Sequence, residues 1–322
     1  MNRTAMIVGV TGQDGAWLAQ HLLGLGYRVV GTSRDAGTAR TSGLEALGIA
    51  GQITLASMNP TDFRSVVQAL AQHQPDEVYN LSGQSSVGLS FEQPVETLDS
   101  IGVGTINLLE AIRFLARPMR IYNAASSECF GEVTSAGADE SHHFHPRSPY
   151  AVAKATSFWL VANYREAYGL FACSGILFNH ESWLRPTRFV TRKIIQTACR
   201  IAAGSGERLR LGNTAIRRDW GWAPEYVVAM HAMLQRDQAE DYVIATGRDA
   251  SLQEFVAEAF ARLGLDWQRH VDCDPALLRP TDLMRSVGNA AKAERGLGWK
   301  AATDWRGVVA RLVEHERTAI RP

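Results

Sequence analysis

The sequence has few cysteines and no net charge, and each of these features excludes some classes of protein. The cysteines are far apart and form no CxxC pair, so we expect reduced, mostly buried thiols instead of a disulfide framework. Lys plus Arg and Asp plus Glu each number 33, so the charge balance predicts neither nucleic acid nor an acidic membrane surface as a partner. The four cysteines are Cys129, Cys173, Cys199 and Cys273.

Long apolar runs and metal-ligand clusters are also missing. No apolar run approaches the roughly 18 residues that span a bilayer, so we expect no membrane partner. An apolar run, Ala5–Val10, begins within a few residues of Met1, which predicts that there is no signal peptide and that the protein is cytoplasmic. The histidine-rich segment 141–145 has no acidic or cysteine partner at a ligand spacing, so we expect no metal site.

The first half of the chain alternates short β-branched runs with longer amphipathic segments. This alternation predicts an α/β fold: a Rossmann-like, doubly wound parallel sheet that binds ligands at the carboxyl ends of its strands. The predicted strands are Met6–Val10, Arg28–Gly31, Ile53–Leu55, Glu77–Leu81, Arg120–Ala124 and Ala172–Leu177. The predicted helices are Trp17–Leu25, Phe63–Gln72, Thr97–Leu115 and Tyr150–Tyr168, with apolar residues at three- and four-residue spacing.

The alternation breaks after Phe178. A polar, turn-like stretch at residues 179–188 is followed by further helical and strand patterns. We therefore predict a dinucleotide-binding Rossmann domain at residues 1–178, with return segments near 212–246, and a smaller, mostly helical, discontinuous substrate domain at 179–322. In this second half of the chain, return segments included, the predicted helices are Phe189–Ala203, Glu225–Arg236, Leu252–Leu263 and Trp305–Thr318, and the predicted strands are Arg208–Leu211 and Tyr242–Ala245.

A glycine-rich turn, GVTGQDG at residues 9–15, lies between the first strand and the first helix. Glycines permit positive φ and close approach of a pyrophosphate, and the helix N-terminus supplies free N–H groups, so the turn predicts dinucleotide binding. After the second strand, Arg34 favours the 2′-phosphate of NADP, whereas the adjacent Asp35 favours the ribose hydroxyls of NAD. The alternative is that both are solvated loop charges.

Two constellations follow the fifth strand. Tyr150 and Lys154 lie one turn apart on a predicted helix, and a lysine cation close to a phenol is expected to move the phenol's pKa from near 10 towards neutrality. Such a tyrosine would remove the proton of a sugar hydroxyl. Upstream, Ser126 is placed to hydrogen-bond that hydroxyl and Glu128 to act as a second acid/base, or else both cap a helix or turn.

Longer stretches of the sequence match one family. The chain resembles, nearly end to end, the GDP-mannose 4,6-dehydratases of the extended short-chain dehydrogenase/reductase superfamily. Beyond the generic TGQDG and YxxxK motifs, the matching stretches are PDEVYNL (75–81), SFEQP (90–94), LLEAIRFL (108–115), PRSPYAVAK (146–154), NYREAYG (163–169), GILFNHES (175–182), FVTRK (189–193), RDWG (218–221) and DYVIATG (241–247).

This resemblance implies a hydro-lyase that converts GDP-mannose to GDP-4-keto-6-deoxymannose. In the family's reaction, Tyr150 would deprotonate the hexose 4-hydroxyl, assisted by Lys154, as hydride passes from C4 to NADP⁺. Glu128 would remove the C5 proton and assist loss of the C6 hydroxyl as water, after which the hydride returns to C6. Ser126 stands where the family usually has threonine, and serine keeps the hydroxyl.

The resemblance also assigns binding residues, NADP as the cofactor with NAD as the alternative, a GDP-sugar as substrate, and a homodimer or homotetramer. This sequence departs from the family at three places. Asn59 replaces an acidic residue that usually faces the adenine, and the double Arg after the second strand is Arg34-Asp35. The family's ESPRRG segment reads ESWLRP (181–186), losing one Arg and gaining Trp183, which either faces a ligand or packs. The cofactor positions are Gly9, Thr11, Gly12, Gln13, Asp14, Gly15, Arg34, Asn59, Leu81, Ser82, Gln84, Tyr150, Lys154, Leu177, His180 and Arg185. The substrate positions are Ser85, Ser126, Glu128, Asn179, Val190, Lys193, Arg218 and Arg279.

Three other functions remain open. A related nucleotide-sugar epimerase or 4-keto reductase would use Tyr150 and Lys154 but would not need Glu128. A 4,6-dehydratase acting on another GDP-sugar, such as a GDP-heptose, would keep the whole acid/base set. A non-catalytic dinucleotide sensor would have no reason to keep Tyr150, Lys154 and Glu128 together.

Overall fold

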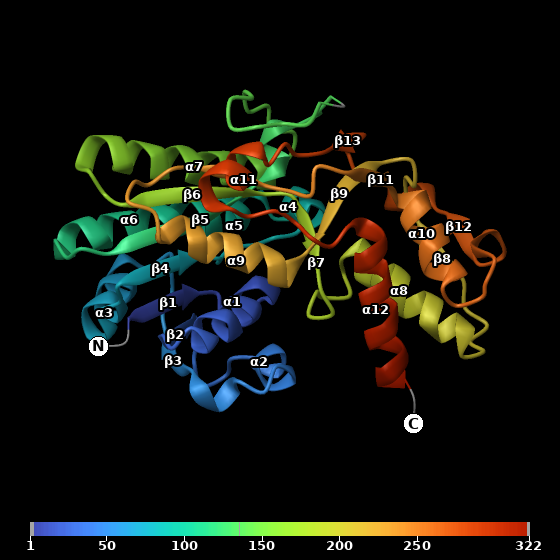
Figure 1. Ribbon diagram of the computed structural model, residues 1–322, viewed down its shortest axis with the longest axis horizontal. Coiled ribbons are helices and arrows are strands. Elements are labelled where there is room, and N and C mark those ends of the chain that lie inside the picture. The colour runs from blue at the N-terminus through green and yellow to red at the C-terminus, as the bar shows by residue number, and fades with distance from the viewer. Residues whose placement is uncertain (1–2, 135, 321–322) are drawn as a thin grey trace.

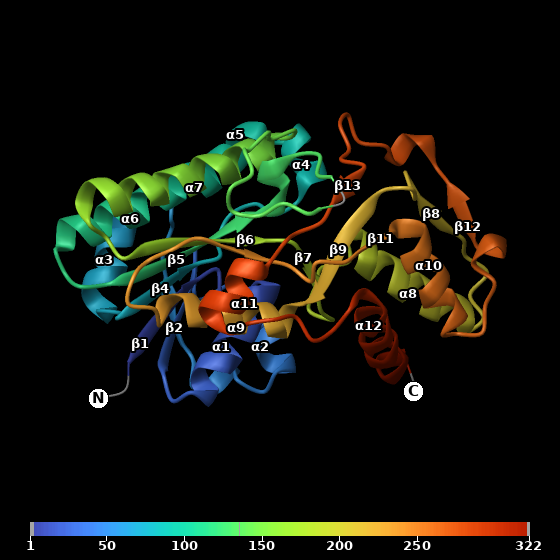
Figure 2. The same ribbon diagram turned by 45° about the horizontal axis from the view of Figure 1, so that its top comes forward.

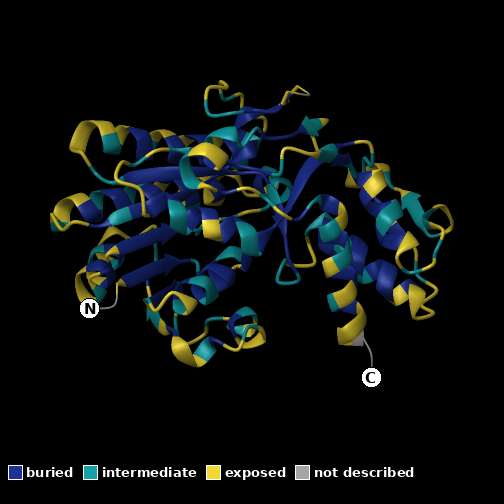
Figure 3. Ribbon diagram, in the orientation of Figure 1, coloured by how far each residue is buried: buried dark blue, intermediate teal, exposed yellow. Residues whose placement is uncertain are grey.

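The computed structural model describes residues 3–134 and 136–320, and its larger body is built on a seven-stranded sheet (Figure 1). All strand pairs in this sheet are parallel, in the spatial order β10-β6-β5-β4-β1-β2-β3. The central strands are buried on both faces, which explains their nearly continuous apolar sequences (Figure 3). The strands are β1 Thr4–Val8, β2 Arg28–Ser33, β3 Thr54–Ser57, β4 Glu77–Asn80, β5 Arg120–Ser126, β6 Ala172–Leu177 and β10 Tyr242–Ile244.

Helices cover both faces of this sheet, so the predicted doubly wound α/β fold is confirmed. Figure 2 shows α6 (Gly104–Leu115) and α7 (Pro149–Tyr168) on one side and α1 (Gln13–Gly24) and α9 (Ala223–Leu234) on the other. Each pair closes a separate apolar core against the strands. The remaining helices of this body are α2 Ser42–Ala46, α3 Phe63–His73, α4 Val87–Glu92, α5 Pro94–Leu98 and α11 Ala291–Leu297.

The smaller body is a helical cluster with its own apolar core. Helices α8 (Val190–Ala202), α10 (Leu252–Ala261) and α12 (Trp305–Ile320) pack together. The parallel pair β8 (Leu209–Leu211) and β12 (Val271–Cys273) lies beside them (Figure 1). None of the helices in the described part of the chain combines the length and the apolar character that crossing a lipid bilayer requires.

A second sheet of four short strands connects the two bodies, and the sequence did not predict it. It contains β7 Asn179–Glu181, β9 Arg217–Trp222, β11 Asp249–Ser251 and β13 Arg285–Ser286. The prediction of a turn starting at Asn179 is therefore wrong: only Phe178 separates β6 from β7, which pairs with β9. Polar residues suggested a turn, but His180 and Glu181 are buried and hydrogen-bonded to groups elsewhere in the fold.

Two predicted helix boundaries also differ. The helix predicted at Thr97–Leu115 is α5, a π-helical turn at Asp99–Val103 and then α6, in which the Gly104 N–H bonds back to the Asp99 carbonyl. A π-turn changes the helical repeat, so apolar spacing alone does not locate it. Helix α1 begins at Gln13, four residues before the predicted start, because its first turn is polar and lacks an apolar repeat.

Candidate active site

The candidate site is a cleft of about 250 Å³ at the carboxyl edge of the main sheet. Its walls come from the segments that follow β1, β4, β5 and β6, from the start of α7, and from the small sheet. The adjacency of β1 and β4 marks the point where the strand order reverses, which is where open α/β sheets bind ligands.

The glycine turn borders this cleft, and its three glycines have different reasons to be glycine. Gly9 has φ +90°, and a Cβ on Gly15 would lie 2.3 Å from the Gly9 carbonyl oxygen, so the turn itself requires both. At Gly12, by contrast, a Cβ would meet only the Gly9 oxygen, at 3.4 Å. Gly12 is exposed and is the N-cap residue of α1, so no N-cap side chain occupies the first N–H groups of this helix. This cradle fits a dinucleotide phosphate.

A buried polar network fixes the glycine turn to β7. The Asp14 carboxylate faces His180 Nε2 at 2.9 Å, the Gln13 amide donates to the His180 carbonyl at 3.2 Å, and Ser182 donates to Gln13 Oε1 at 2.9 Å. Burial alone would raise the pKa of Asp14, but the facing His180 holds it down at about 2. Burial favours a neutral ring, yet the Asp14 carboxylate raises the pKa of His180 above its ordinary value. The two groups therefore form an ion pair that positions the turn.

Tyr150 and Lys154 both line the cleft from the first turns of α7, but their pKa values do not follow the expectation from sequence. Burial raises the pKa of Tyr150, and the Ser126 hydroxyl opposes that rise only in part. Burial also lowers the pKa of Lys154 to about 8. The Lys154 ammonium donates to the Ala124 carbonyl at 2.7 Å and lies 5.9 Å from the Tyr150 ring centre. The prediction that Lys154 brings the phenol's pKa towards neutrality is therefore wrong for this structure, because burial raises that pKa by more than the Ser126 hydroxyl and the Arg185 charge lower it.

Glu128 enters the cleft from the 3₁₀ turn that follows β5. The Ser126 hydroxyl caps this turn by accepting the Glu128 N–H at 3.3 Å, so capping and a place in the cleft coexist. Burial raises the pKa of Glu128, and Arg218 and Arg279 pull it in the opposite direction. Asp282 lies 3.3 Å from Arg218 and 3.8 Å from Arg279, which divides the charge of these arginines between two carboxylates. Glu128 is thus a carboxyl that binds a proton more readily than a solvated glutamate does.

The structure brings most of the predicted site residues to this single cleft. These are Asp14, Leu81, Ser82, Ser85, Ser126, Glu128, Tyr150, Lys154, Leu177, Asn179, His180, Arg185, Val190, Arg218 and Arg279. Predicted residues of the adjoining glycine turn are Gly9, Thr11, Gly12, Gln13 and Gly15.

Four predicted residues lie outside both the cleft lining and the glycine turn. The Gln84 amide donates to the Ser86 carbonyl at 2.8 Å within its own loop, and the Lys193 ammonium of α8 donates to the Arg210 carbonyl of β8 at 2.6 Å. Asn59 accepts the Thr61 hydroxyl at 3.0 Å within its turn. Arg34 is exposed after β2 and has no hydrogen bond or ion pair within residues 3–134 and 136–320, whereas Asp35 accepts from Gly37 and Thr38. Their assigned roles stay predictions.

Several cleft residues were missed by reasoning from sequence. Phe189, Thr191 and Trp220 lie in stretches that match the family but were not assigned to the site, and no motif marks the other three. The missed cleft residues are Ser127, Arg188, Phe189, Thr191, Ile216 and Trp220. Trp183, for which a ligand-facing and a packing role were both open, packs. Its ring stacks on His315 of α12 with centroids 4.7 Å apart and meets Trp17 of α1 edge-on at 4.9 Å.

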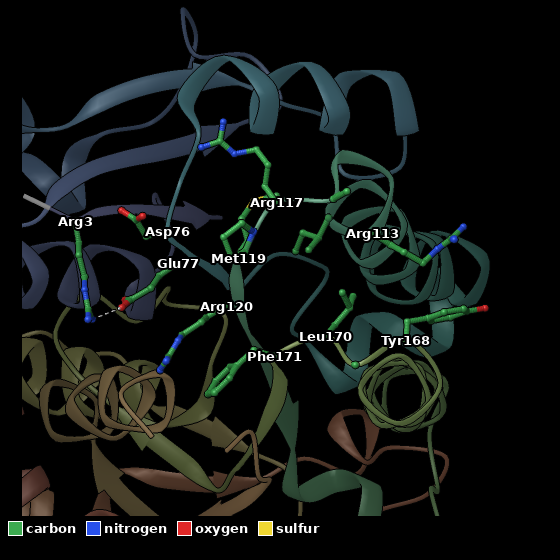
Figure 4. A pocket seen from close by; sticks show the side chains of 14 residues that line it. Arg3, Asp76, Glu77, Arg113, Arg117, Met119, Arg120, Tyr168, Leu170 and Phe171 are labelled. Atoms are coloured by element: carbon green, nitrogen blue, oxygen red, sulfur yellow. Dashed lines mark hydrogen bonds and ion pairs between the residues drawn. The ribbon is translucent and has the colours of Figure 1, made fainter. Parts of the chain in front are cut away.

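A larger cavity of about 710 Å³ lies at the opposite, amino edge of the sheet (Figure 4). Four arginines line it, and three of them are engaged with the protein. Arg3 pairs with Glu77 at 3.2 Å, Arg113 pairs with Glu110 at 2.7 Å, and Arg120 donates to the carbonyls of Leu234 and Arg236. Volume alone would select this cavity, but the acid/base residues lie in the smaller one.

A doubly wound parallel sheet with a glycine turn and a tyrosine–lysine pair at its carboxyl edge defines a protein of the short-chain dehydrogenase/reductase class. The family described as GDP-mannose 4,6 dehydratase matches residues 6–312. GDP-mannose 4,6 dehydratase 2 of Arabidopsis thaliana is 42% identical over 98% of this chain and 87% of its own length. The chain therefore belongs to the GDP-mannose 4,6-dehydratase family.

Solved structures at lower identity share the fold. UDP-glucose 4-epimerase of Thermus thermophilus, in complex with NAD, superimposes with a TM-score of 0.86 at 23% identity, covering 98% of this chain and all of its own. The RMD protein of Pseudomonas aeruginosa, complexed with NADPH, gives a TM-score of 0.81 at 21% identity, covering 99% of this chain and all of its own. At these identities the likeness is one of fold alone.

Proposed function

We propose that this chain converts GDP-mannose to GDP-4-keto-6-deoxymannose with loss of water. The observation that carries this proposal is that Glu128 shares one cleft with Ser126, Tyr150 and Lys154. Oxidation or reduction of a sugar hydroxyl needs one proton-transferring group, whereas elimination of water from the neighbouring carbons needs another. A cleft with both a phenol and a carboxyl has the groups that elimination requires.

The residues around Tyr150 would remove the proton of the sugar's 4-hydroxyl. Tyr150 accepts this proton, and Ser126 hydrogen-bonds the same oxygen. Lys154 is fixed by the Ala124 carbonyl and supplies positive charge behind the phenol. The raised pKa of Tyr150 and the lowered pKa of Lys154 mean that bound ligands must help to stabilise the phenolate. When bound, an oxidised nicotinamide supplies a hydride acceptor and a further positive charge.

Glu128 would carry out the elimination. A 4-keto group makes the C5 proton acidic, and a carboxylate on a short turn after β5 is placed to remove it and to assist departure of the C6 hydroxyl. The pKa of Glu128, raised by burial, makes the carboxylate a stronger base than a solvated glutamate would be.

Binding of the two ligands follows from the residues around the cleft. The glycine turn, Leu81, Ser82, Leu177, His180 and Arg185 would hold a nicotinamide dinucleotide. We propose NADP as that dinucleotide, because Arg34 is unpaired within the described residues while Asp35 is occupied by its own loop. Ser85, Asn179, Val190, Lys193, Arg218 and Arg279 would bind the GDP-sugar.

Assembly, compartment and the division of labour between the two bodies are part of the same proposal. We propose that residues 1–178 with their return segments bind the dinucleotide, that the discontinuous part at 179–322 binds the sugar nucleotide, and that the protein is cytoplasmic. The exposed apolar side chains of Val95, Leu98 and Trp159 near one face of the larger body support a homodimer or homotetramer. Light scattering after size-exclusion chromatography measures that state.

The deciding experiment follows the sugar without added reductant. Mass spectrometry of purified protein with GDP-mannose and NADP⁺ is expected to show loss of one water, and substrate deuterated at C4 is expected to give product labelled at C6. Accumulation of free NADPH, with label in the cofactor, would contradict the proposal in favour of an ordinary dehydrogenase. A GDP-heptose run in parallel tests the alternative sugar.

A further inference from the structure

Four arginines line the cleft, and they differ in how far the protein already satisfies them. Arg185 pairs with Glu181 at 3.4 Å, while Arg218 and Arg279 both pair with Asp282. Arg188 is exposed, and no carboxylate in the part of the chain that the structure describes lies within ion-pair distance of it. A cation without a counter-charge at a cleft wall is available to an anionic ligand.

The setting of Arg188 favours a phosphate. Its guanidinium carbon lies 5.3 Å from the centre of the Phe189 ring, and that of Arg185 lies 3.9 Å from the same ring. Phe189 is also the N-cap residue of α8 and supplies no side-chain hydrogen bond, so the first N–H groups of this helix of 13 residues have no side-chain cap. Two guanidinium groups beside an uncapped helix N-terminus form a positive region suited to a doubly charged oxyanion.

The segment that carries Arg188 is anchored to three other elements. Ser182 donates to Gln13 in the glycine turn, Trp183 stacks on His315 of α12, and the same Trp183 ring meets Trp17 of α1. These contacts fix the start of the segment, and the Phe189 N–H, which bonds to the Pro186 carbonyl at 3.1 Å, holds its end as a turn, so the backbone that carries Arg188 is held at the cleft wall.

We propose that Arg188 binds a phosphate group of the ligand that occupies this cleft. Two ligands could supply this phosphate group: a sugar nucleotide, through its diphosphate, and the dinucleotide, through its pyrophosphate. The proposal rests on the proposed function only for the identity of these two ligands. Arg188 is a binding residue and takes no part in proton transfer.

The test measures binding without turnover. Calorimetric titration of Arg188→Gln with GDP, and separately with NADP⁺, is expected to show an increase of about 10- to 100-fold in the Kd of one of the two, since charge-assisted hydrogen bonds are lost. If only the affinity for GDP falls, Arg188 binds the sugar nucleotide. If only the affinity for NADP⁺ falls, Arg188 binds the cofactor. Arg188→Lys, which keeps the charge but not the planar fork, is expected to recover part of the affinity.

The matched control is Arg295→Gln on α11, another exposed arginine without a carboxylate partner in the described ranges, and outside the cleft. It is expected to leave both Kd values unchanged. Unchanged Kd values for both ligands in Arg188→Gln, with an unchanged thermal midpoint, would overturn the proposal. Wild-type protein that binds GDP through Arg188 but fails to dehydrate GDP-mannose would leave this inference standing and refute the proposed function.

Discussion

The two edges of the central sheet both carry a cavity rich in arginine, yet they differ in what their arginines contact. At the amino edge, around 710 Å³, Arg3 pairs with Glu77 (Figure 4), and Arg113 pairs with Glu110. Arg120 donates to the carbonyls of Leu234 and Arg236 at the end of α9, and Arg117 is exposed with no ion pair in the described residues. At the carboxyl edge, around 250 Å³, Arg188 is exposed and has no such partner in the described chain.

Parallel strands explain the difference. Helices that follow parallel strands begin at the carboxyl edge and end at the amino edge, so one edge collects helix N-termini and the other collects helix C-termini. Helices α1, α7 and α8 begin beside the smaller cleft, whereas α6 and α7 end beside the larger one. Arg120 at the amino edge donates to carbonyl groups at the end of α9, whereas Arg188 at the carboxyl edge lies beside the N-terminus of α8. Each edge has one exposed arginine without an ion pair in the described chain, Arg117 and Arg188, so the acid/base residues and the helix N-termini locate the site better than volume does.

The largest expected effect contrasts a tyrosine at each edge. Tyr150→Phe is expected to lower kcat by at least about 10³-fold, because the phenol that takes the proton is lost, and to leave the Kd for GDP within about threefold. Tyr168→Phe at the amino edge is expected to leave kcat unchanged. Steady-state kinetics and calorimetry measure both, and near-normal kcat in Tyr150→Phe would remove the proton-abstraction role.

The next effect separates elimination from redox chemistry. Glu128→Gln is expected to slow dehydration by about 10²- to 10³-fold, because glutamine keeps the shape of the side chain but cannot take the C5 proton. Under single-turnover conditions the absorbance of reduced nicotinamide should then build up, and the C5 hydrogen should fail to exchange with deuterated solvent. Glu77→Gln, at a buried carboxyl of the amino edge, serves as the control and should alter stability instead of kcat. Dehydration by Glu128→Gln near the wild-type rate would favour the epimerase or reductase.

The pH dependence of kcat/KM gives a smaller effect, about tenfold per pH unit outside the optimum. Activity requires Glu128 as carboxylate, and burial raises its pKa, so the acidic limb should lie above the range of a solvated glutamate. Activity also requires Lys154 as the cation, and its pKa of about 8 places the alkaline limb there. Lys154→Arg should shift the alkaline limb to higher pH, and a limb that does not move would exclude Lys154 as its source.

The smallest effect is expected at the amino edge. Arg120→Met removes two hydrogen bonds to carbonyls and the contact of its guanidinium with the Phe171 ring, 4.3 Å from the ring centre. We expect a loss of about 1–2 kcal/mol in the free energy of unfolding and no change in kcat/KM. Arg117→Gln, an exposed neighbour, should change stability by less than about 0.5 kcal/mol. Urea denaturation measures both stability changes. A lower kcat/KM in either variant would contradict the conclusion that the amino edge takes no part in catalysis.

The strands of the main sheet were largely predictable because a strand that is buried on both faces consists of a short continuous run of apolar residues. The strand β7 was not, because His180 and Glu181 become compatible with burial only through Asp14, Thr191 and other groups distant in sequence. The π-turn at Asp99–Val103 was missed for a different reason: a single turn with a longer helical repeat leaves the overall apolar pattern of the helix unchanged.

The acid/base residues were predictable because each follows a recognisable strand or opens a recognisable helix. Arg188 was not, because nothing local tells whether a loop arginine faces a cleft or solvent. The direction of the Tyr150 pKa shift was also mispredicted, since spacing reveals the neighbouring lysine but not the extent of burial. Local chemistry is visible in sequence, whereas its surroundings depend on long-range packing.

The outermost position of β10 in the main sheet has a consequence for synthesis of the chain on the ribosome. Until Tyr242–Ile244 emerges, β6 is an open edge strand, with unpaired backbone groups on an apolar segment. At about 5–20 residues per second, the intervening stretch 178–241 leaves that edge uncovered for several seconds. A nascent chain arrested within this stretch, or a fragment cut after Phe178, is therefore the form most exposed to aggregation and to capture by chaperones.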